Sequence, residues 1–438
     1  MGALTGRSRD AGVQEPEPIR ILDIELAGPI PPIEPAVGAR ERPYRRAQAL
    51  IRLHNRPMGM LELDLPAGGL SAADHAQAIW QALAPQIRDH LLQDGWPYPG
   101  RLTPAGLLGP RPAPCELVRR RFLAHAPLAS IVICTQDRPQ LAAAALDTLL
   151  AQRYPHYETI LVDNDIASSA TASLARTRLA HEPRLRYTRE PRPGLARARN
   201  RGLALARGEI TAFADDDALM DPDWLAELVR AFAASERVAC VTGLVMPMQM
   251  DYAPQIWFER FAGYERGFSR RIFDPAAPPA DEPLFPFRAS RFGTGSNMAF
   301  RTAYLRTSGG FDPSLGAGTP CSGEDLEAFL RAIADGYQVV YEPGAVTHHL
   351  HRPGYEPMRR QLAHYGTGLT AYLASSLLRR PSLALGLLRK APRAVAFALT
   401  RRRTLKLPAK SYPPDLDRAL LHGLLVGPLA YLRSRRAS

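Results

Sequence analysis

The sequence predicts an α/β fold for its main domain, with a mostly parallel central sheet that helices cover on both faces. The evidence is a set of short apolar runs rich in β-branched residues, separated by helical patterns, at 129–134, 157–163, 184–188 and 209–215. Strands that alternate with helices form right-handed crossovers and therefore lie parallel in one sheet. Three of these runs end in polar side chains, and such sheets bind ligands beyond the carboxyl ends of their strands.

Length and composition agree with a folded chain of two or three domains. The 438 residues are 46% apolar and 22% charged, which excludes collagen-like, coiled-coil and wholly disordered proteins. No apolar run approaches 18 residues and no signal-like segment opens the chain, so we expect a soluble, cytoplasmic protein. The four scattered cysteines lack C-x-x-C spacing, so we expect neither a disulfide framework nor a zinc cluster.

Two segments precede the main domain. Residues 1–43 contain seven prolines, which predicts an extended or poorly ordered lead-in. Residues 44–126 predict a small ββα accessory domain, with strands at 49–54 and 60–65 across a turn that starts at Asn55. A helix with apolar residues at helical spacing follows, and a Pro/Gly-rich stretch ends the unit. No catalytic constellation is visible in it.

The main domain, residues 127–352, carries polar residues where its strands end. They are Thr135, Gln136 and Asp137 after the first strand, Asp163 and Asn164 after the second, and Asp215, Asp216 and Asp217 after the fourth. Three consecutive carboxylates repel one another unless a cation or hydrogen-bond donors offset their charge. Mg²⁺ and Mn²⁺ prefer oxygen ligands and bridge carboxylates to nucleotide phosphates. The alternative is an acidic cluster before the helix that Asp221 starts, but an apolar strand that ends directly in the triplet favours a metal.

A series of motifs then occurs in order between residues 129 and 352. They are Ser130-Ile-Val-Ile-Cys-Thr-Gln-Asp-Arg-Pro, Ile160-Leu-Val-Asp-Asn, Gly194-Leu-Ala-Arg-Ala-Arg-Asn-Arg-Gly, Phe213-Ala-Asp-Asp-Asp, Gly295-Ser-Asn-Met-Ala-Phe-Arg, Gly309-Gly-Phe-Asp, Gly323-Glu-Asp-Leu-Glu and Tyr341-Glu-Pro-Gly-Ala-Val-Thr-His-His. In this order they resemble glycosyltransferase family 2, the inverting, nucleotide-sugar-dependent transferases. Each motif is weak alone, but their joint order is specific. The resemblance implies a Rossmann-like GT-A fold.

The resemblance also implies roles for individual residues. Contacts to the nucleotide sugar are assigned to Thr135, Asp137, Asp163, Arg199, Asp215, Asp216 and Asn297. A divalent cation, Mn²⁺ or Mg²⁺, is assigned to Asp215, Asp217 and His349, with His348 as the alternative histidine. Asp325 is assigned the role of general base, with Glu324 as the second candidate. The base takes the proton from the acceptor hydroxyl as that hydroxyl attacks the anomeric carbon.

Each assignment has a structural alternative. Asp163 can form an Asx turn, and the acidic pair Glu324–Asp325 can complement a helix dipole. A single histidine can be a hydrogen-bonding residue at a strand end. An insertion after Val245 carries aromatic residues at spacings of three and four, which suit sugar stacking but favour core packing.

The C-terminal region, residues 353–438, accounts for the net charge of +12. From Arg352 onward there are 17 Lys and Arg against 3 Asp and Glu. Helical patterns at 362–378 and 383–399 interleave leucines with arginines, which suits peripheral attachment to the anionic inner face of the cell membrane. The alternatives are helices that pack on the main domain, or a site for an acidic polymer. No nucleic-acid-binding motif occurs, so we expect no nucleic acid partner.

These observations predict a metal-dependent, inverting glycosyltransferase that moves one sugar from a nucleotide-diphosphate sugar to an acceptor hydroxyl. The acceptor is expected to be a glycan or lipid-linked molecule of envelope or exopolysaccharide synthesis. The chain lacks the Q-x-x-R-W motif of processive family members, which predicts a non-processive enzyme. A nucleotidyltransferase on a related sheet and a catalytically idle sugar-nucleotide-binding protein are the alternatives.

Overall fold

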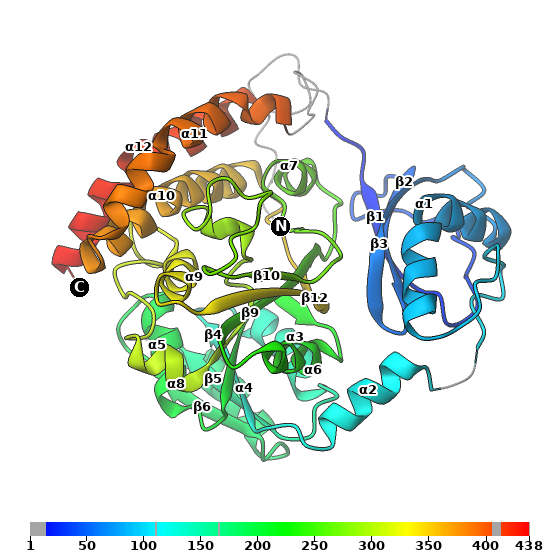
Figure 1. The fold of residues 1–438 in the computed structure, drawn as a ribbon, viewed down its shortest axis with the longest axis horizontal. Helices are drawn as coiled ribbons and strands as arrows, with labels where there is room; N and C mark the ends of the chain where they lie inside the picture. Colours follow the sequence, from blue (N-terminus) through cyan, green and yellow to red (C-terminus); the bar gives the residue numbers. More distant parts are fainter. Residues whose placement is uncertain (1–14, 110–111, 165–166, 405–412, 438) are drawn as a thin grey trace.

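The computed structural model describes residues 15–109, 112–164, 167–404 and 413–437. They form a small N-terminal unit, a central α/β domain and a group of C-terminal helices (Figure 1). The N-terminal unit and the C-terminal helices lie on different sides of the central domain. Within the described residues, every helix is too short or too polar to cross a membrane.

The central sheet confirms the predicted α/β class. Its described strands lie in the order β10 (Arg271–Phe273), β12 (Gln338–His349), β9 (Val238–Pro247), β11 (Asn297–Arg301), β7 (Ile210–Asp215), β4 (Ala129–Thr135), β5 (Tyr157–Asp163) and β6 (Leu185–Arg189), with β8 (Ala218–Met220) paired to β12. The strands β7, β4, β5 and β6 are parallel neighbours, and so are β9 and β12. β11 runs antiparallel between β7 and β9, so the sheet is mixed at that point.

Helices cover both faces of this sheet because alternate residues of a strand point to opposite sides. One face is covered by α3 (Pro139–Leu150), α4 (Ala170–Leu179) and α6 (Trp224–Ala231), and the other by α5 (Leu195–Leu205), α8 (Thr302–Thr307) and α9 (Glu324–Ala334). In β4, Ile131 and Ile133 belong to the first core and Val132 to the second. The apolar runs of the sequence are therefore strands buried on both sides.

The N-terminal unit contains three strands instead of the two expected. β1 (Ile19–Glu25) pairs parallel with β2 (Arg46–Leu53), which pairs antiparallel with β3 (Arg56–Asp64). The expectation of a poorly ordered lead-in over residues 1–43 is thus wrong for residues 15–43, while residues 1–14 lie outside the described ones. Prolines flank β1 without interrupting it, and an edge strand tolerates them there.

The N-terminal unit also contains a tight β2–β3 hairpin and two helices. The β2–β3 turn consists of His54 and Asn55, whose φ angles of 55° and 63° are left-handed. Such two-residue turns match the twist of the flanking strands. The turn therefore starts one residue earlier than expected. Two helices follow, α1 (Ala72–Gln93) and α2 (Pro114–Leu123), and α2 leads into the central domain.

The C-terminal region forms α10 (Tyr355–Arg379), α11 (Leu383–Thr404) and α12 (Pro414–Ala437). The helices α10 and α12 touch closely, because a Cβ at Gly423 would stand 2.3 Å from the carbonyl oxygen of Ala363. The Tyr431 hydroxyl of α12 donates a hydrogen bond to Asp312 at 2.9 Å. α10 and α12 therefore pack back on the central domain, which was one of the alternatives for this region.

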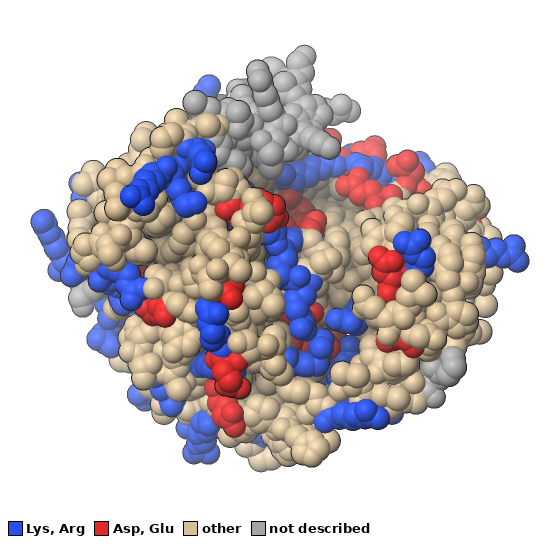
Figure 2. Space-filling model, in the orientation of Figure 1, with Lys and Arg blue, Asp and Glu red and all other residues tan. Residues whose placement is uncertain are grey.

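Charged side chains gather where the N-terminal unit meets the central domain. On the face drawn in Figure 2, Lys and Arg side chains line the hollow between the two, with Asp and Glu beside them. Arg52 of β2 pairs with Asp221 at 2.8 Å, and Arg119 of α2 pairs with Glu227 at 2.7 Å. Ion pairs thus join the two units.

Candidate active site

A cavity of about 1520 Å³ opens at the carboxyl ends of β4 and β7. Its polar wall includes Thr135, Gln136, Arg138, Asn164, Arg199, Asp215, Asp216, Asp217, Glu324, Asp325 and His349. These residues come from strand ends, from the first turn of α9 and from α5. The cavity therefore lies where a parallel α/β sheet binds its ligands.

The three carboxylates of the aspartate triplet differ in burial. Asp216 is buried, where it accepts hydrogen bonds from the Thr135 hydroxyl at 2.6 Å and pairs with Arg138 at 2.7 Å. Burial raises the pKa of Asp216 to about 7. Asp215 and Asp217 are partly exposed in the cavity wall. The middle carboxylate thus supports the turn, and the outer two are available to a ligand.

His349 completes a cluster with these two carboxylates. Its Nε2 lies 3.3 Å from Asp217 Oδ1, and the ligand atoms of Asp215, Asp217 and His349 all lie within 4.8 Å of one another. Burial acts to raise the pKa of Asp217, but His349 and Arg138 outweigh it and hold the pKa below its ordinary value. Two carboxylates and an imidazole are ligands that suit Mn²⁺ or Mg²⁺. The residues present therefore fit a divalent cation.

His348 belongs to a different environment. It precedes His349 on β12, so its side chain points to the opposite side of the strand. There Asp23, Arg52 and Asp221 are the charged groups that act on it, and burial lowers the pKa of its imidazole. Of the two histidines that the sequence left open, His349 is thus the one beside the aspartate triplet.

Arg199 connects the two acidic parts of the cavity. Its guanidinium donates hydrogen bonds to Asp215 Oδ1 at 3.0 Å, to Glu324 Oε1 at 2.8 Å and to the carbonyl oxygen of Gly295 at 3.0 Å. The side chain is 2% exposed. All three partners are acceptors, so the buried positive charge is fully compensated.

The acidic pair begins α9, directly after Gly323, whose φ of 103° allows the sharp entry into the helix. Asp325 Oδ2 accepts a hydrogen bond from the backbone N–H of Gly295 at 2.7 Å. Burial, together with the nearby Asp325 carboxylate, raises the pKa of Glu324 to about 7. The acidic pair thus contains one carboxyl group whose pKa is raised to about 7, Glu324, and a second carboxylate, Asp325, held by the loop before β11.

Asn297 does not lie where the resemblance implied. It is fully buried, its amide donates to the carbonyl oxygens of Leu244 and Ala345, and its oxygen accepts from the Trp224 indole at 2.8 Å. These bonds tie β11 to its neighbours. Because both amide protons and the amide oxygen already have partners in the core, the expected contact of Asn297 with the nucleotide sugar is corrected to a structural role.

Asp163 and Asp137 also lie outside the cavity wall. Asp163 is fully buried and accepts a hydrogen bond from the Tyr187 hydroxyl at 2.7 Å, with Arg189 at 3.3 Å. Asp137 is exposed in the loop after β4 with a left-handed φ of 53°. Contacts of these two aspartates with a nucleotide stay predictions.

Two features of the site were missed or left open by the sequence. Arg138, which pairs with Asp216 and Asp217 at 2.7 and 2.8 Å, follows the first strand but carried no signal of its own. The aromatic residues of α7 (Ala253–Ala262), including Trp257 and Phe258, pack in a core with α10 and α12. Core packing was the favoured alternative for them.

The sheet, the aspartate triplet and the cavity define a class of protein. Residues 130–307, which run from β4 to the end of α8, match the model of Glycosyl transferase family 2. The central domain therefore belongs to glycosyl transferase family 2, a family of transferase enzymes.

Particular relatives resemble parts of the chain. O-antigen biosynthesis protein RfbC of Myxococcus xanthus is 31% identical over 233 residues, which is 52% of this chain and 18% of that protein. Glucosyl-dolichyl phosphate glucuronosyltransferase of Haloferax volcanii is 27% identical over 113 residues, 25% of this chain and 31% of that one. The chain thus spans less than a third of either relative. A solved structure of the mannosyltransferase PcManGT from Pyrobaculum calidifontis with GDP-Man and Mn²⁺ is 20% identical, with a TM-score of 0.46 over 72% of this chain and 93% of that one.

Proposed function

We propose that the chain is a metal-dependent, inverting glycosyltransferase that transfers one sugar from a nucleotide-diphosphate sugar to an acceptor hydroxyl. The observation that carries the proposal is the arrangement of two acidic groups on one cavity, Asp215 and Asp217 with His349 on one side and Glu324 with Asp325 on the other. The family match of the central domain supports a sugar transfer. The cavity of about 1520 Å³ has room for a donor and part of an acceptor.

The cluster of Asp215, Asp217 and His349 is the proposed site of Mn²⁺ or Mg²⁺. When bound, the cation would offset the negative charge of the donor diphosphate. Thr135 and Arg138 hold Asp216 and leave the outer carboxylates directed to the cavity. Arg199 fixes Asp215 through the hydrogen bond at 3.0 Å. We assign the nucleotide-sugar contacts to Thr135, Arg199 and Asp215, with Asp137 and Asp163 as further candidates. The buried Asp216, expected to make such a contact, instead supports the turn through Thr135 and Arg138.

Asp325 is the proposed general base. In an inverting transfer, the base takes the proton of the acceptor hydroxyl, the acceptor oxygen bonds to the anomeric carbon, and the bond from that carbon to the diphosphate breaks. Asp325 suits this role because the Gly295 N–H fixes one carboxylate oxygen in the cavity wall. Glu324 is the alternative base, but its carboxylate is already paired with Arg199.

The proposed acceptor is a glycan or lipid-linked molecule at the inner face of the cell membrane. The two relatives are an O-antigen biosynthesis protein and a glucosyl-dolichyl phosphate glucuronosyltransferase, which supports this class of acceptor. Large apolar side chains are exposed on α11 and α12, namely Leu385, Leu388, Val395, Leu421, Leu425, Leu429 and Leu432. Leucines exposed beside many arginines support peripheral attachment to an anionic membrane surface.

Product analysis tests the proposal. Thermal shift with Mn²⁺ first selects donors from a panel of nucleotide sugars, because a ligand that binds the folded state raises its melting temperature. The selected donor is then incubated with lipid-linked and glycan acceptors. We expect release of a nucleoside diphosphate and a glycoside whose anomeric configuration, read by NMR, is inverted. Pyrophosphate released from a nucleoside triphosphate would instead indicate a nucleotidyltransferase, and background transfer across all panels would indicate a binding protein.

A further inference from the structure

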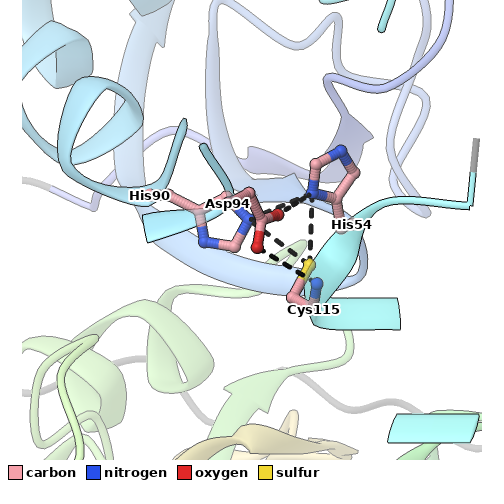
Figure 3. Close-up of side chains that lie close together, drawn as sticks. All are labelled: His54, His90, Asp94 and Cys115. Atoms are coloured by element: carbon pink, nitrogen blue, oxygen red, sulfur yellow. Dashed lines mark hydrogen bonds and ion pairs between the residues drawn. The ribbon is translucent and has the colours of Figure 1, made fainter. Parts of the chain in front are cut away.

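Four side chains of the N-terminal unit converge on one point away from the active site. They are His54, His90, Asp94 and Cys115, drawn in Figure 3. His54 belongs to the β2–β3 turn, His90 and Asp94 to the end of α1, and Cys115 to the first turn of α2. One ligand atom from each lies within 4.8 Å of all the others, and the two histidines and the aspartate are buried.

The distances between these atoms match a tetrahedral metal site. His54 Nδ1 lies 3.1 Å from His90 Nε2, 3.1 Å from Asp94 Oδ2 and 3.4 Å from Cys115 Sγ, which lies 3.8 Å from His90 Nε2. In a tetrahedral zinc site, metal–ligand distances of about 2.0–2.3 Å put the ligand atoms about 3.3–3.8 Å apart. The observed separations lie within a few tenths of an ångström of these values.

We propose that His54, His90, Asp94 and Cys115 bind one zinc ion. Two imidazole nitrogens, one thiolate and one carboxylate oxygen suit zinc, because a soft sulfur ligand selects against Mg²⁺ and Mn²⁺. Four protein ligands leave no open position, which is typical of a structural site. The donor set thus differs from the oxygen-rich cluster in the active site.

Hydrogen bonding explains the cluster less well than a cation does. The Nδ1 atom of His54 faces three polar atoms, yet a ring nitrogen carries either one proton or one lone pair. A cation in the centre would contact all four atoms at once.

The surrounding structure fixes the ligands. The Trp96 ring packs edge-on against His54 with centroids 4.8 Å apart. The backbone N–H of Cys115 donates to Asp94 Oδ1 at 3.1 Å, which leaves Oδ2 for the ion. A cavity of about 230 Å³, lined in part by Glu25, His54 and Glu116, borders the cluster at His54.

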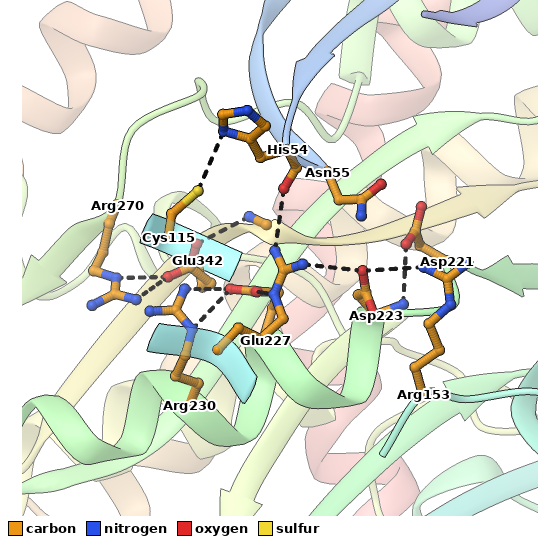
Figure 4. Close-up of polar contacts among 12 residues, drawn as sticks. His54, Asn55, Cys115, Arg153, Asp221, Asp223, Glu227, Arg230, Arg270 and Glu342 are labelled. Atoms are coloured by element: carbon orange, nitrogen blue, oxygen red, sulfur yellow. Dashed lines mark hydrogen bonds and ion pairs between the residues drawn. The ribbon is translucent and has the colours of Figure 1, made fainter. Parts of the chain in front are cut away.

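The zinc site would fix α2 between the N-terminal unit and the central domain. Cys115 is one helical turn from Arg119, which donates to Glu227 at 2.7 Å and to Asp223 at 3.3 Å on the central domain. Figure 4 shows His54 and Cys115 directly beside this network of ion pairs. A metal that holds Cys115 against His54 therefore also positions the arginine through which α2 contacts α6.

Metal analysis of the purified full-length chain tests the proposal. We expect one zinc per chain by elemental mass spectrometry in the wild type, in Asp217→Asn and in Cys321→Ala, which removes a buried cysteine of the central domain. Cys115→Ala and His90→Ala should lose this zinc. Wild-type protein without stoichiometric zinc, even after incubation with Zn²⁺ and removal of the excess, would overturn the proposal.

A second measurement does not depend on how well the variants fold. Apo wild-type protein loaded with Co²⁺ should show the near-ultraviolet thiolate-to-cobalt charge-transfer band and the intense visible bands of tetrahedral Co²⁺. Stoichiometric Zn²⁺ should abolish the bands and protect Cys115 from a thiol reagent. Wild-type protein without the charge-transfer band, or with unchanged Cys115 reactivity on Zn²⁺ addition, would mean that the cluster is a hydrogen-bonded core only.

Discussion

Arg199 donates a hydrogen bond to Glu324 at 2.8 Å, and both side chains are buried in the wall of the active-site cavity. The same guanidinium donates to Asp215 at 3.0 Å. The buried Arg199 guanidinium therefore links a carboxylate of the proposed metal site to a carboxylate of the acidic pair Glu324–Asp325. Its loss would leave buried negative charge without compensation.

Arg199→Met should lower the free energy of unfolding by about 3–5 kcal/mol, because removal of one partner of a buried ion pair strands the other. Urea denaturation of the variant and the wild type measures the difference. The matched control is Arg201→Met on the exposed side of α5, which should change the free energy by less than about 0.5 kcal/mol. Equal effects of the two substitutions would contradict the bridging role of Arg199.

Asp325→Asn should lower kcat by about 10²–10⁴-fold, the usual contribution of general base catalysis. The affinity for the donor should stay nearly unchanged, since the base acts mainly in the transition state. Steady-state kinetics and donor calorimetry separate the two effects. If Glu324→Gln lost kcat by this factor while Asp325→Asn stayed active, Glu324 would be the general base instead.

The rate of transfer should fall as the pH drops through about 7. The pKa of Glu324 is raised to about 7 by burial and by Asp325, so below that pH the pair gains a proton and the base is less available. A pH profile of kcat/KM measures this step. Because burial also raises the pKa of Asp216 to about 7, the Asp216→Asn variant is the control. If the step disappears in Asp216→Asn, it does not belong to the acidic pair.

Leu425→Glu combined with Leu429→Glu should reduce co-sedimentation with anionic liposomes at low salt. Leu425 is 80% exposed on α12, and a carboxylate there opposes both apolar contact and anionic lipid. Leu108→Glu, at a 72% exposed leucine of the N-terminal unit, is the control and should bind as the wild type does. If co-sedimentation of the wild-type protein did not depend on lipid charge or ionic strength, the proposed membrane attachment would be contradicted.

Much of the central domain could be predicted because its signal is local. The apolar runs that became β4, β5 and β7 are buried on both faces, so composition alone marks them. Their polar ends form the cavity because parallel strands bring their carboxyl ends to one edge. Thr135 and the aspartate triplet followed from this rule, whereas Arg199 and the acidic pair followed from the family resemblance.

The remaining features depend on contacts that are distant in the sequence. The direction in which the Asn297 side chain points depends on the position of β11 between β7 and β9 in the sheet. No local sequence pattern shows that position. The cluster around Cys115 was missed because its ligands come from three elements, with Cys115 and His54 separated by 61 positions. Cysteine spacing detects zinc sites built from short motifs, and this cluster has a single cysteine.

The most direct test of the central claim is donor binding by Asp217→Asn in the presence of Mn²⁺. Asp217 lies with Asp215 and His349 at the proposed cation site, and its side chain pairs only with His349 and Arg138, which also belong to the cavity wall. Calorimetry should show Mn²⁺-dependent donor binding by the wild type and a loss of at least about 10–100-fold in the variant. The control Asp147→Asn, at an exposed aspartate of α3, should bind as the wild type does. Unchanged Mn²⁺-dependent binding in Asp217→Asn would contradict the account.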